Sequence, residues 1–284
     1  MRLPFSADAH LGGREFMTQP TQITGRTKVM FIMGDPIGHV VGTAVLNAAW
    51  EAAGRDLVTV PLHVRSADLP HMLDMLRKAE NLAGTGITIP HKIAAMGLVE
   101  HLTEAARLAG AVNFIRRNAD GTLTGHNVDG AGFLAGLHAH GVNPAGRHVV
   151  LAGAGGVARA IAFSLAGADI ASLAILNRDT AKAEALASDI IASGITGAPV
   201  VTTAGPVPDL LVNGTALGMK PTDPLPFPID EIPSAAAVAE VVMTPADTPL
   251  LVAAKAKGCT IIPGRAMLDP QADLVARFLD GDPA

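Results

Sequence analysis

A glycine-rich turn between a hydrophobic run and a helical segment is the part of this chain best suited to bind a phosphate. Residues 148–160 read His-Val-Val-Leu-Ala-Gly-Ala-Gly-Gly-Val-Ala-Arg-Ala, which predicts a buried strand followed by a turn and a helix. Gly153 permits the tight turn, Gly155 lets the main chain approach a pyrophosphate, and Ala158 lets the helix pack on the sheet. Free N–H groups at the helix start would face the anion, so the stretch predicts a dinucleotide site.

A second hydrophobic run, 172–176, ends in Asn177 and Arg178, where a dinucleotide-binding fold places its ribose contact. An NAD-specific site usually has an acidic residue there, whereas a guanidinium can pair with the 2′-phosphate of NADP. The sequence therefore favours NADP. NAD stays open as an alternative, because Asp179 follows at once and would repel the phosphate if its side chain pointed inward.

Two polar clusters follow predicted strands in the first half of the chain, at residues 84–92 and 125–130. Ligand crevices in open α/β sheets lie at the carboxyl ends of strands, so these clusters are candidates for the group that moves a proton beside a nicotinamide. Taken alone, Lys92 fits a surface lysine better than a catalyst. Asp129, taken alone, fits a helix cap equally well.

The composition excludes several classes of partner. The chain has 284 residues, of which 49% are hydrophobic, and this length allows two domains. A net charge of −5 without a basic block predicts neither nucleic acid nor a membrane as partner, and no hydrophobic run reaches the ~20 residues of a membrane span. Cys259 is the single cysteine, which agrees with a reducing cytosol. We expect a cytoplasmic monomer or homodimer that acts on a small molecule.

No metal site is predicted, because the ten histidines lack a paired spacing with carboxylates or thiols. We expect structural roles for three of them. His39 would cap a helix or bind the main chain, His91 would be exposed beside Lys92, and His126 would take no direct part in chemistry. Residues 1–16 lack the hydrophobic middle of a signal peptide, and Met17 is a candidate natural start, so they are left out of the predicted fold.

The hydrophobic periodicity predicts two α/β domains. Strands are expected at 29–33, 57–64 and 86–89, then in a hairpin at 112–116 and 123–127, and in the second half from 148, at 172–176, near 200, at 210–213 and at 238–243. Helices are expected at 43–53, 67–79, 92–99, 103–109, 131–140 and 266–279. The alternation predicts parallel sheets in both halves, with the last helix folding back on the first half.

Short motifs follow one another over almost the whole chain. In the first half they are Gly-Asp-Pro-Ile-Gly-His at 34–39, Thr-Ile-Pro-His-Lys at 88–92, Gly-Ala-Val-Asn at 110–113 and Asn-Val-Asp-Gly at 127–130. In the second half they are the glycine turn, Asn-Arg at 177–178, Asn-Gly-Thr at 213–215, Thr-Pro-Leu-Leu at 248–251 and Gly-Arg-Ala-Met-Leu-Asp-Pro-Gln-Ala at 264–272. In this order they resemble the shikimate dehydrogenase family. The resemblance implies a catalytic domain over 24–130 and 265–284, an NAD(P)-binding Rossmann domain over 131–264, and a cleft between them.

By position, the resemblance implies that Lys92 and Asp129 are the catalytic pair. The lysine would assist proton removal from a substrate hydroxyl while hydride leaves the same carbon, and the aspartate would orient the lysine and relay the proton. Thr88, Asn113 and Gln271 match positions that bind ring hydroxyls. The implied cofactor residues are Gly153, Ala154, Gly155, Gly156 and Val157 at the phosphates, Asn177 and Arg178 at the adenosine ribose and its phosphate, and Thr215, Val241, Gly264 and Met267 on the nicotinamide side.

The substrate side departs from the family's pattern. The family normally has Ser-x-Ser-Pro, whose hydroxyls hold the substrate carboxylate, and Val40 and Gly42 stand at the two serine positions. The family's tyrosine is Met243, and an asparagine is Gly86. A lost hydrogen bond to a charged group costs about 1.5–3 kcal/mol, so losing two predicts that shikimate binds more weakly by roughly two to four decades. Thr43 could replace one hydroxyl only if the main chain shifted.

These residues predict an NADP-dependent dehydrogenase of the shikimate/quinate type, acting on shikimate or a related cyclic hydroxy acid. Three alternatives stay open: a dinucleotide-binding regulatory protein with little turnover, a dehydrogenase of a different polyol, and a methylene-folate dehydrogenase. Lys92 and Asp129 argue against a pure binding protein, which has no need of both. The motifs at 127–130 and 264–272 favour the shikimate side over the folate enzyme.

Overall fold

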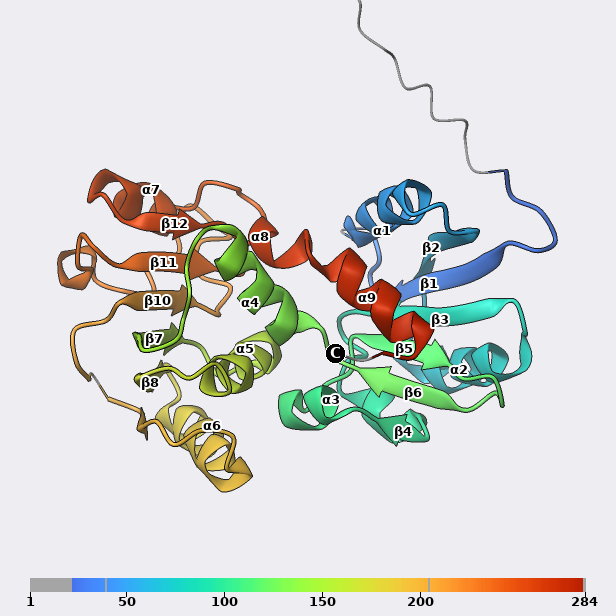
Figure 1. Cartoon of the computed structure of the whole chain (residues 1–284), viewed down its shortest axis with the longest axis horizontal. Helices are drawn as coiled ribbons and strands as arrows, with labels where there is room; N and C mark the ends of the chain where they lie inside the picture. Colours follow the sequence, from blue (N-terminus) through green and yellow to red (C-terminus); the bar gives the residue numbers. More distant parts are fainter. Residues whose placement is uncertain (1–21, 39, 204, 283–284) are drawn as a thin grey trace, which may run out of the picture.

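The computed structural model describes residues 22–38, 40–203 and 205–282, and it contains two α/β lobes joined by helices (Figure 1). His39 and residues 1–16, which carried expectations above, lie outside the described residues. Each lobe is built on a six-stranded sheet. None of the helices in these ranges is long and hydrophobic enough to cross a membrane.

The first lobe contains a mixed sheet with the strand order β2-β1-β3-β5-β6-β4. The strands are β1 (Lys28–Gly34), β2 (Leu57–His63), β3 (Leu82–Ile87), β4 (His101–Leu102), β5 (Phe114–Arg117) and β6 (Leu123–His126). β1 is parallel to β2 and β3, but β5 is antiparallel to β3 and β6. The predicted hairpin joins β5 and β6, so β5 is antiparallel to both of its neighbours, while the other pairs of this sheet are parallel.

Helices α1 (Gly42–Ala52), α2 (Leu69–Lys78) and α3 (Glu104–Ala109) pack around this sheet, with single turns η1 (Ser66–Asp68) and η2 (Ala94–Leu98) between them. The predicted α-helix over 92–99 was wrong, because η2 is a 3₁₀ turn in a segment that follows Pro90 and contains Gly97. The strand expected at 86–89 is β3, which begins earlier and ends at Ile87. Thr88 therefore lies directly after the carboxyl end of a strand.

The second lobe contains a parallel sheet with the strand order β12-β11-β10-β7-β8-β9. The strands are β7 (His148–Ala152), β8 (Ser172–Leu176), β9 (Val200–Val201), β10 (Leu210–Asn213), β11 (Ala237–Glu240) and β12 (Thr260–Ile262). The other elements are α5 (Gly156–Ala166), α6 (Thr180–Ser193), η3 (Ile229–Glu231) and α7 (Pro249–Ala256). Numbered within the lobe, the order is 6-5-4-1-2-3, which is the doubly wound Rossmann arrangement. The predicted parallel second sheet is confirmed.

Three helices connect the lobes: α4 (Asp129–Ala139), α8 (Arg265–Leu268) and α9 (Gln271–Asp280) (Figure 1). Phe133 and Leu137 of α4 belong to the core of the second lobe, whereas Val275 and Phe278 of α9 belong to that of the first. The single helix expected over 266–279 was wrong. It is broken before α9 at Pro270, since proline has no N–H to continue a helix.

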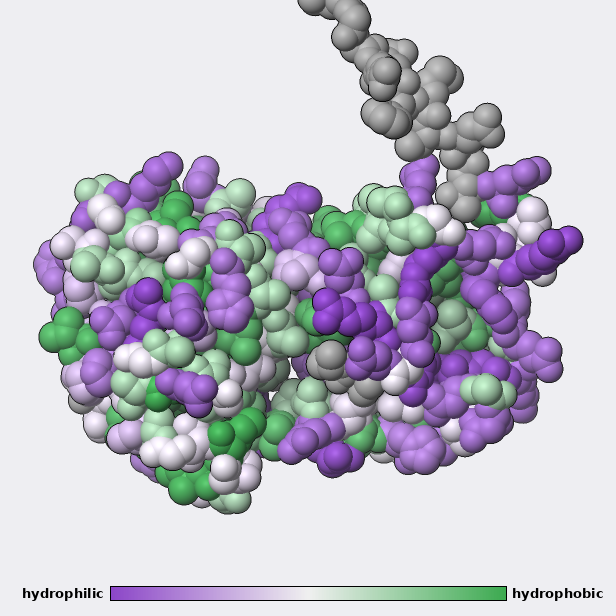
Figure 2. Space-filling view, viewed as in Figure 1, coloured by the Kyte–Doolittle hydropathy of each residue, from purple (hydrophilic) through white to green (hydrophobic). Residues whose placement is uncertain are grey.

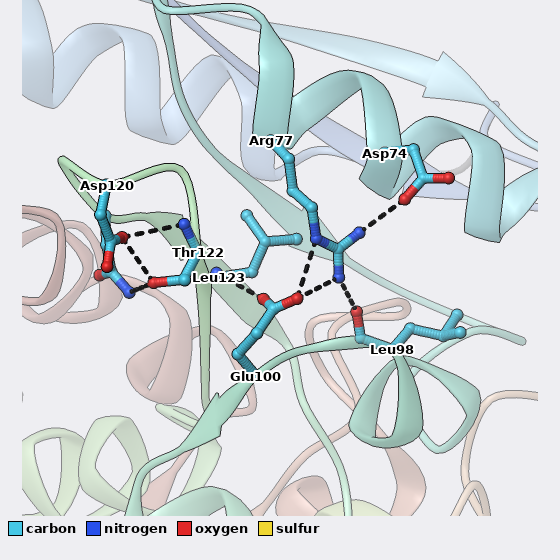
Figure 3. Close-up of polar contacts among 8 residues, drawn as sticks. Asp74, Arg77, Leu98, Glu100, Asp120, Thr122 and Leu123 are labelled. Carbon is cyan, nitrogen blue, oxygen red and sulfur yellow. Dashed lines mark hydrogen bonds and ion pairs between the residues drawn. The ribbon is translucent and has the colours of Figure 1, made fainter.

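Arg77 fastens α2 to the segment between η2 and β4 (Figure 3). Its guanidinium contacts Glu100 Oε1 at 2.9 Å and Asp74 Oδ1 at 2.9 Å, and it donates to the carbonyl oxygen of Leu98 at 2.6 Å. Glu100 also accepts the N–H of Leu123 at 2.8 Å. Burial works to raise the pKa of Glu100, but the bonds from Leu123 and Arg77 together hold it below its ordinary value. The network joins a helix, a turn and the hairpin into one unit.

Hydrophobic residues are scattered over the face drawn in Figure 2, and hydrophilic residues separate them. The lobe on the right, which contains the first sheet in Figure 1, is mostly hydrophilic in this view, while the lobe on the left has more hydrophobic spots. Such scattered exposure is normal for a surface that meets water. What is visible of this face therefore needs no partner to cover it.

Candidate active site

A cavity of about 250 Å³ lies between the lobes and takes lining residues from both. Pockets for drug-sized ligands occupy ~300–1,000 Å³, so a cavity just below this range suits a molecule smaller than these. The cavity gathers the predicted catalytic and substrate residues, with three of the predicted cofactor residues. They are Val40, Gly42, Thr88, Lys92, Asn113, Asp129, Met243 and Gln271, with Val157, Val241 and Met267.

Lys92 and Asp129 form an ion pair in this cavity. Lys92 Nζ lies 2.9 Å from Asp129 Oδ2. The lysine side chain is 25% exposed and the aspartate side chain is 8% exposed. Lys92 follows the turn after β3, and Asp129 is the first residue of α4, so the fold joins two distant parts of the chain here. An amine that a carboxylate holds beside an open cavity can exchange a proton with a ligand oxygen.

Two buried asparagines hold Asp129 in its orientation. Asn113 Nδ2 donates to Asp129 Oδ1 at 2.9 Å, and Asn113 Oδ1 accepts the N–H of Val128 at 3.0 Å. Asn127 Oδ1 accepts the N–H of Asp129 at 2.9 Å. Each carboxylate oxygen of Asp129 therefore has its own partner, and the carboxylate cannot turn away from the lysine without losing one of them.

Hydrophobic side chains from β1 and α1 form a large part of the cavity lining. Gly42 lies at the first turn of α1, beside Val40, Val45 and Leu46. Thr43 is not among the lining residues within the described part of the chain. Its hydroxyl therefore does not take the place of a serine at position 42, in agreement with the main-chain shift that this would have required.

Gly86 and Met243 occupy two further positions where the sequence departs from the family. A Cβ atom at Gly86 would lie 3.2 Å from side-chain carbons of both Ile32 and Phe114, so these two side chains fill the space that a larger residue would need. Met243 lines the cavity from the second lobe and is 40% exposed. At both positions the cavity meets hydrophobic atoms.

A second cavity, of about 850 Å³, lies along the carboxyl ends of β7, β8 and β10. This is the point where the strand order reverses, and open α/β sheets bind their ligands there. The volume is sufficient for a large ligand. Its lining contains the predicted cofactor residues Gly153, Ala154, Gly155, Asn177, Arg178 and Thr215.

The glycine turn has the geometry that a pyrophosphate requires. Gly153 has φ +115°, which L side chains rarely adopt, and its Cβ would lie 3.0 Å from the main chain of Gly214. A Cβ at Gly155 or Gly156 would meet nothing within 4 Å. Gly155 is the N-cap of α5 and supplies no side-chain cap, so the first N–H groups of the helix stay available to an anion.

Three of the four residues predicted on the nicotinamide side, Val241, Gly264 and Met267, lie where the second lobe meets α8. Val241 and Met267 line the smaller cavity. Gly264 lines neither cavity among the described residues, but its Cβ would lie 2.2 Å from the carbonyl oxygen of Val242. Glycine at 264 therefore lets the start of α8 approach the main chain that carries Val241.

Lys182 is a residue of the larger cavity that the sequence analysis missed. It lines the larger cavity with Arg178 and Asp179, and its Nζ lies 3.8 Å from Asp179 Oδ2. The charge of Lys182 therefore reduces the repulsion between the Asp179 carboxylate and a phosphate. The sequence did contain a signal for this contact: Asp179 and Lys182 are three positions apart at the start of α6, and residues with this spacing share a helix face.

Two histidines are structural. His91 was expected to be exposed, which was wrong: it is 1% exposed, and its Nε2 lies 2.7 Å from the carbonyl oxygen of Val64. His126 stacks on Phe278 of α9 with ring centroids 4.8 Å apart. Burial, assisted by the charge of Arg116, lowers the pKa of His126 to about 4. It is therefore neutral near pH 7 and helps hold α9 on the first lobe.

Glu240 is a second residue that the sequence analysis missed. It ends β11, directly before the cavity residue Val241, and is 1% exposed. Its Oε2 accepts the Thr248 hydroxyl at 2.9 Å, while its Oε1 is buried without a hydrogen-bond partner in the described structure. Burial raises the pKa of Glu240 to about 7, although the bond from Thr248 opposes the shift. A carboxylate in an apolar strand gives no periodic signal from which this burial could be predicted.

The chain is similar to known proteins over most of its length. Residues 32–115 match the model of the shikimate dehydrogenase substrate binding domain. The shikimate dehydrogenase (NADP(+)) of Rubrobacter xylanophilus is 36% identical over 282 residues, which cover 92% of this chain and 98% of the relative. The match to the domain model lies in the first lobe, and the match to the relative extends across both lobes.

Two solved structures share the fold. A ligand-free 5-ketofructose reductase of Gluconobacter sp. strain CHM43 has a TM-score of 0.83 and 33% identity, covering 91% of this chain and 94% of that one. A shikimate dehydrogenase in complex with NADP+ has a TM-score of 0.84 and 30% identity, covering 92% of each chain. With the sequence similarity, these likenesses establish that the chain belongs to the shikimate dehydrogenase family.

Proposed function

We propose that this protein is an NADP-dependent dehydrogenase that interconverts a secondary alcohol and a ketone on a small polyhydroxylated substrate, with Lys92 and Asp129 as the catalytic pair. The observation that carries the proposal is the ion pair itself, which lies in a cavity that also contains Val157, Val241 and Met267 of the opposite side. Proton-transferring groups and cofactor-side residues thus share one small volume. The names of the relatives agree with this class of reaction.

The residues of the larger cavity fit NADP. The open approach to Gly155 and Gly156 accommodates a pyrophosphate, and Arg178 with Lys182 offers two cations for the 2′-phosphate. The relative from Rubrobacter is named for NADP(+), and a structural relative contains it. When bound, NADP accepts hydride from the alcohol carbon or, in its reduced form, returns it to the ketone carbon.

The proton step falls to Lys92. In the reduction direction its charged Nζ donates a proton to the ketone oxygen. In the oxidation direction Lys92 first passes a proton to Asp129, and its Nζ then accepts the hydroxyl proton of the substrate. Asp129 Oδ2, 2.9 Å away, holds the Nζ in place for both transfers. Asn113 fixes the other carboxylate oxygen, so the pair is oriented before the substrate arrives.

The remaining polar residues of the cavity bind and orient the substrate. We assign Thr88, Asn113 and Gln271 to its other hydroxyl groups, because all three line the cavity that contains the pair. We also propose the domain division 24–130 with 265–284, and 131–264. The packing of α9 on the first sheet and of α4 in the second core supports it.

A panel assay tests the reaction class. Reduced-nicotinamide absorbance is followed with shikimate, quinate, and related cyclic hydroxy acids and polyols, each with NADP and with NAD. Turnover that disappears in Lys92→Ala supports the proposal. If no compound turns over while NADP still binds, the regulatory binding protein becomes the better description.

A dehydrogenase of a different polyol is the second candidate. The relative from Gluconobacter is named a 5-ketofructose reductase, so this fold serves more than one hydroxylated substrate. Val40 and Gly42 both line the cavity, and neither has a hydroxyl that could hold the carboxylate of shikimate. This favours a different polyol over shikimate itself. The same panel separates the two by their relative kcat/KM values.

A further inference from the structure

The lining of the cavity between the lobes is divided between polar and hydrophobic residues. Thr88, Lys92, Asn113, Asp129 and Gln271 supply its polar atoms. The hydrophobic part comes from both lobes. The first lobe supplies Ile32, Val40, Val45, Leu46 and Phe114, and the other side supplies Val157, Val241, Met243 and Met267. A ligand that fills this volume must therefore present hydroxyl groups to one set of residues and an uncharged surface to the other.

The charges of the lining already balance each other. Among the lining residues that the structure describes, Lys92 is the one cation and Asp129 the one anion. Their side chains form the 2.9 Å ion pair, and Asp129 accepts a further bond from Asn113. A negatively charged group on the substrate would have to compete with Asp129 for Lys92, and this would disturb the pair that the reaction needs.

A carboxylate would also lose its water without compensation at the hydrophobic part of the lining. Transfer of an ion into an apolar surrounding is unfavourable unless an opposite charge pairs with it, whereas a hydroxyl loses far less. The start of α1 attracts negative charge, because the first N–H groups of a helix carry partial positive charge and the N-cap Val41 supplies no side-chain bond to them. That attraction is small beside the free energy of desolvating a carboxylate, and a neutral oxygen also satisfies these N–H groups.

From this division we infer that the natural substrate is uncharged: a small polyhydroxylated alcohol or ketone without a carboxylate or phosphate, whose C–H surface lies against Val40, Val45 and Ile32. The inference rests on the proposed function and adds the substrate class to it. Val40 and Gly42 become the positions that determine specificity for an uncharged substrate.

Gly42 offers a way to reverse this preference. Among the residues that the structure describes, a Cβ atom there would meet only Ile32 Cδ1, at 3.5 Å, which is an ordinary contact. A serine therefore fits at 42 without displacing the main chain, and serine at 40 is smaller than the valine it replaces. The double variant Val40→Ser/Gly42→Ser places two hydroxyls beside the first N–H groups of α1, where they can donate to a carboxylate.

The matched control is Val41→Ser. Val41 lies between the two positions but is 60% exposed and is not among the described lining residues, so its hydroxyl would face water. It introduces the same residue type at the same helix start. Any effect of serine on the stability of α1, rather than on the substrate, would appear in this variant too.

The test compares shikimate with its primary amide, which has nearly the same shape and no charge. We expect wild type to give a kcat/KM at least about tenfold higher for the amide, and the double variant to shift the ratio toward the acid by at least about tenfold. Val41→Ser should keep the wild-type ratio. A wild-type ratio that favours the acid, or equal values for both compounds, overturns the inference.

Binding measured by calorimetry in the presence of NADP+ separates this inference from the proposed function. If neither compound turns over but the amide binds more tightly than the acid, the proposed dehydrogenase fails and the inferred preference stands. Tighter binding of the acid, or no binding of either compound, overturns the preference. The inference therefore has a readout that does not depend on turnover.

Discussion

Lys92 Nζ and Asp129 Oδ2 are 2.9 Å apart although the two residues are 37 positions apart in the chain. The contact joins the loop after β3 to the first turn of α4, the helix that leads into the second lobe. Asp129 is buried there by Asn113 and Asn127, which satisfy its carboxylate and its N–H. The proposed catalytic pair thus lies at the junction between the lobes.

Replacing Asp129 by asparagine should leave the fold intact and remove the charge from the pair. The amide of Asp129→Asn can still meet Asn113, but it cannot stabilise a protonated Lys92. We expect kcat to fall by about a hundredfold, with a change in its pH profile and little change in NADP binding. Steady-state rates across pH check this, and a wild-type kcat in the variant would contradict the assignment.

Asn113→Leu should affect both stability and catalysis. The variant removes the donor to Asp129 Oδ1 and the acceptor of the Val128 N–H, both of which are buried. Leaving buried groups unpaired costs about 1–3 kcal/mol each, so the free energy of unfolding should fall measurably in urea. A stable variant with normal kinetics would show that Asn113 does not position the carboxylate.

Arg178→Ala should weaken NADP by about tenfold and leave NAD nearly unchanged, because a guanidinium pairs with the 2′-phosphate that NAD lacks. Asp179→Asn is the matched variant of opposite sign, since it removes the anion that follows Arg178 and contacts Lys182. It should strengthen NADP slightly. Titration calorimetry with both cofactors decides the question, and equal losses for NADP and NAD in Arg178→Ala would rule out a phosphate contact.

Glu240 should make the protein less stable as the pH rises. Its pKa is about 7 in the folded protein against an ordinary 4.5, so the folded state holds the proton more tightly than the unfolded state between these values. The free energy of unfolding therefore falls as the pH rises through this window, by up to ~3 kcal/mol. Glu240→Gln should remove that slope in urea titrations between about pH 5 and about pH 8.

The control for this titration is Glu231→Gln, which changes an exposed carboxylate of η3. It should retain the wild-type slope, because it leaves Glu240 and its buried surroundings unchanged. A wild-type slope in Glu240→Gln as well would mean that another group causes the pH dependence.

The sequence predicts local features well where neighbouring residues decide them. The strand at 172–176 has the predicted bounds, and the turn through Gly153 has the positive φ that its glycine indicates. These features depend on hydrophobic periodicity and on the conformational freedom of one residue. The cavity residues were found in a different way, by their match to the family's motifs.

Features that depend on distant parts of the chain were not predictable from periodicity. The antiparallel placement of β5 depends on pairing with β3, which lies more than twenty residues earlier. His91 was expected at the surface, but it is buried and its ring binds the carbonyl oxygen of Val64, which lies in the segment after β2. Glu240 lies on β11, which is covered by β12 on one side and β10 on the other, and only the strand order reveals this.

The most direct test of the central claim is the kcat of Lys92→Ala, measured with NADP and the fastest compound of the panel, beside the Kd for NADP. Lys78→Ala, a change to an exposed lysine of α2, is the control. We predict that Lys92→Ala lowers kcat by at least about a hundredfold while its Kd for NADP stays within about twofold of wild type. A kcat close to wild type in Lys92→Ala would contradict the assignment of Lys92 as the proton-transferring residue.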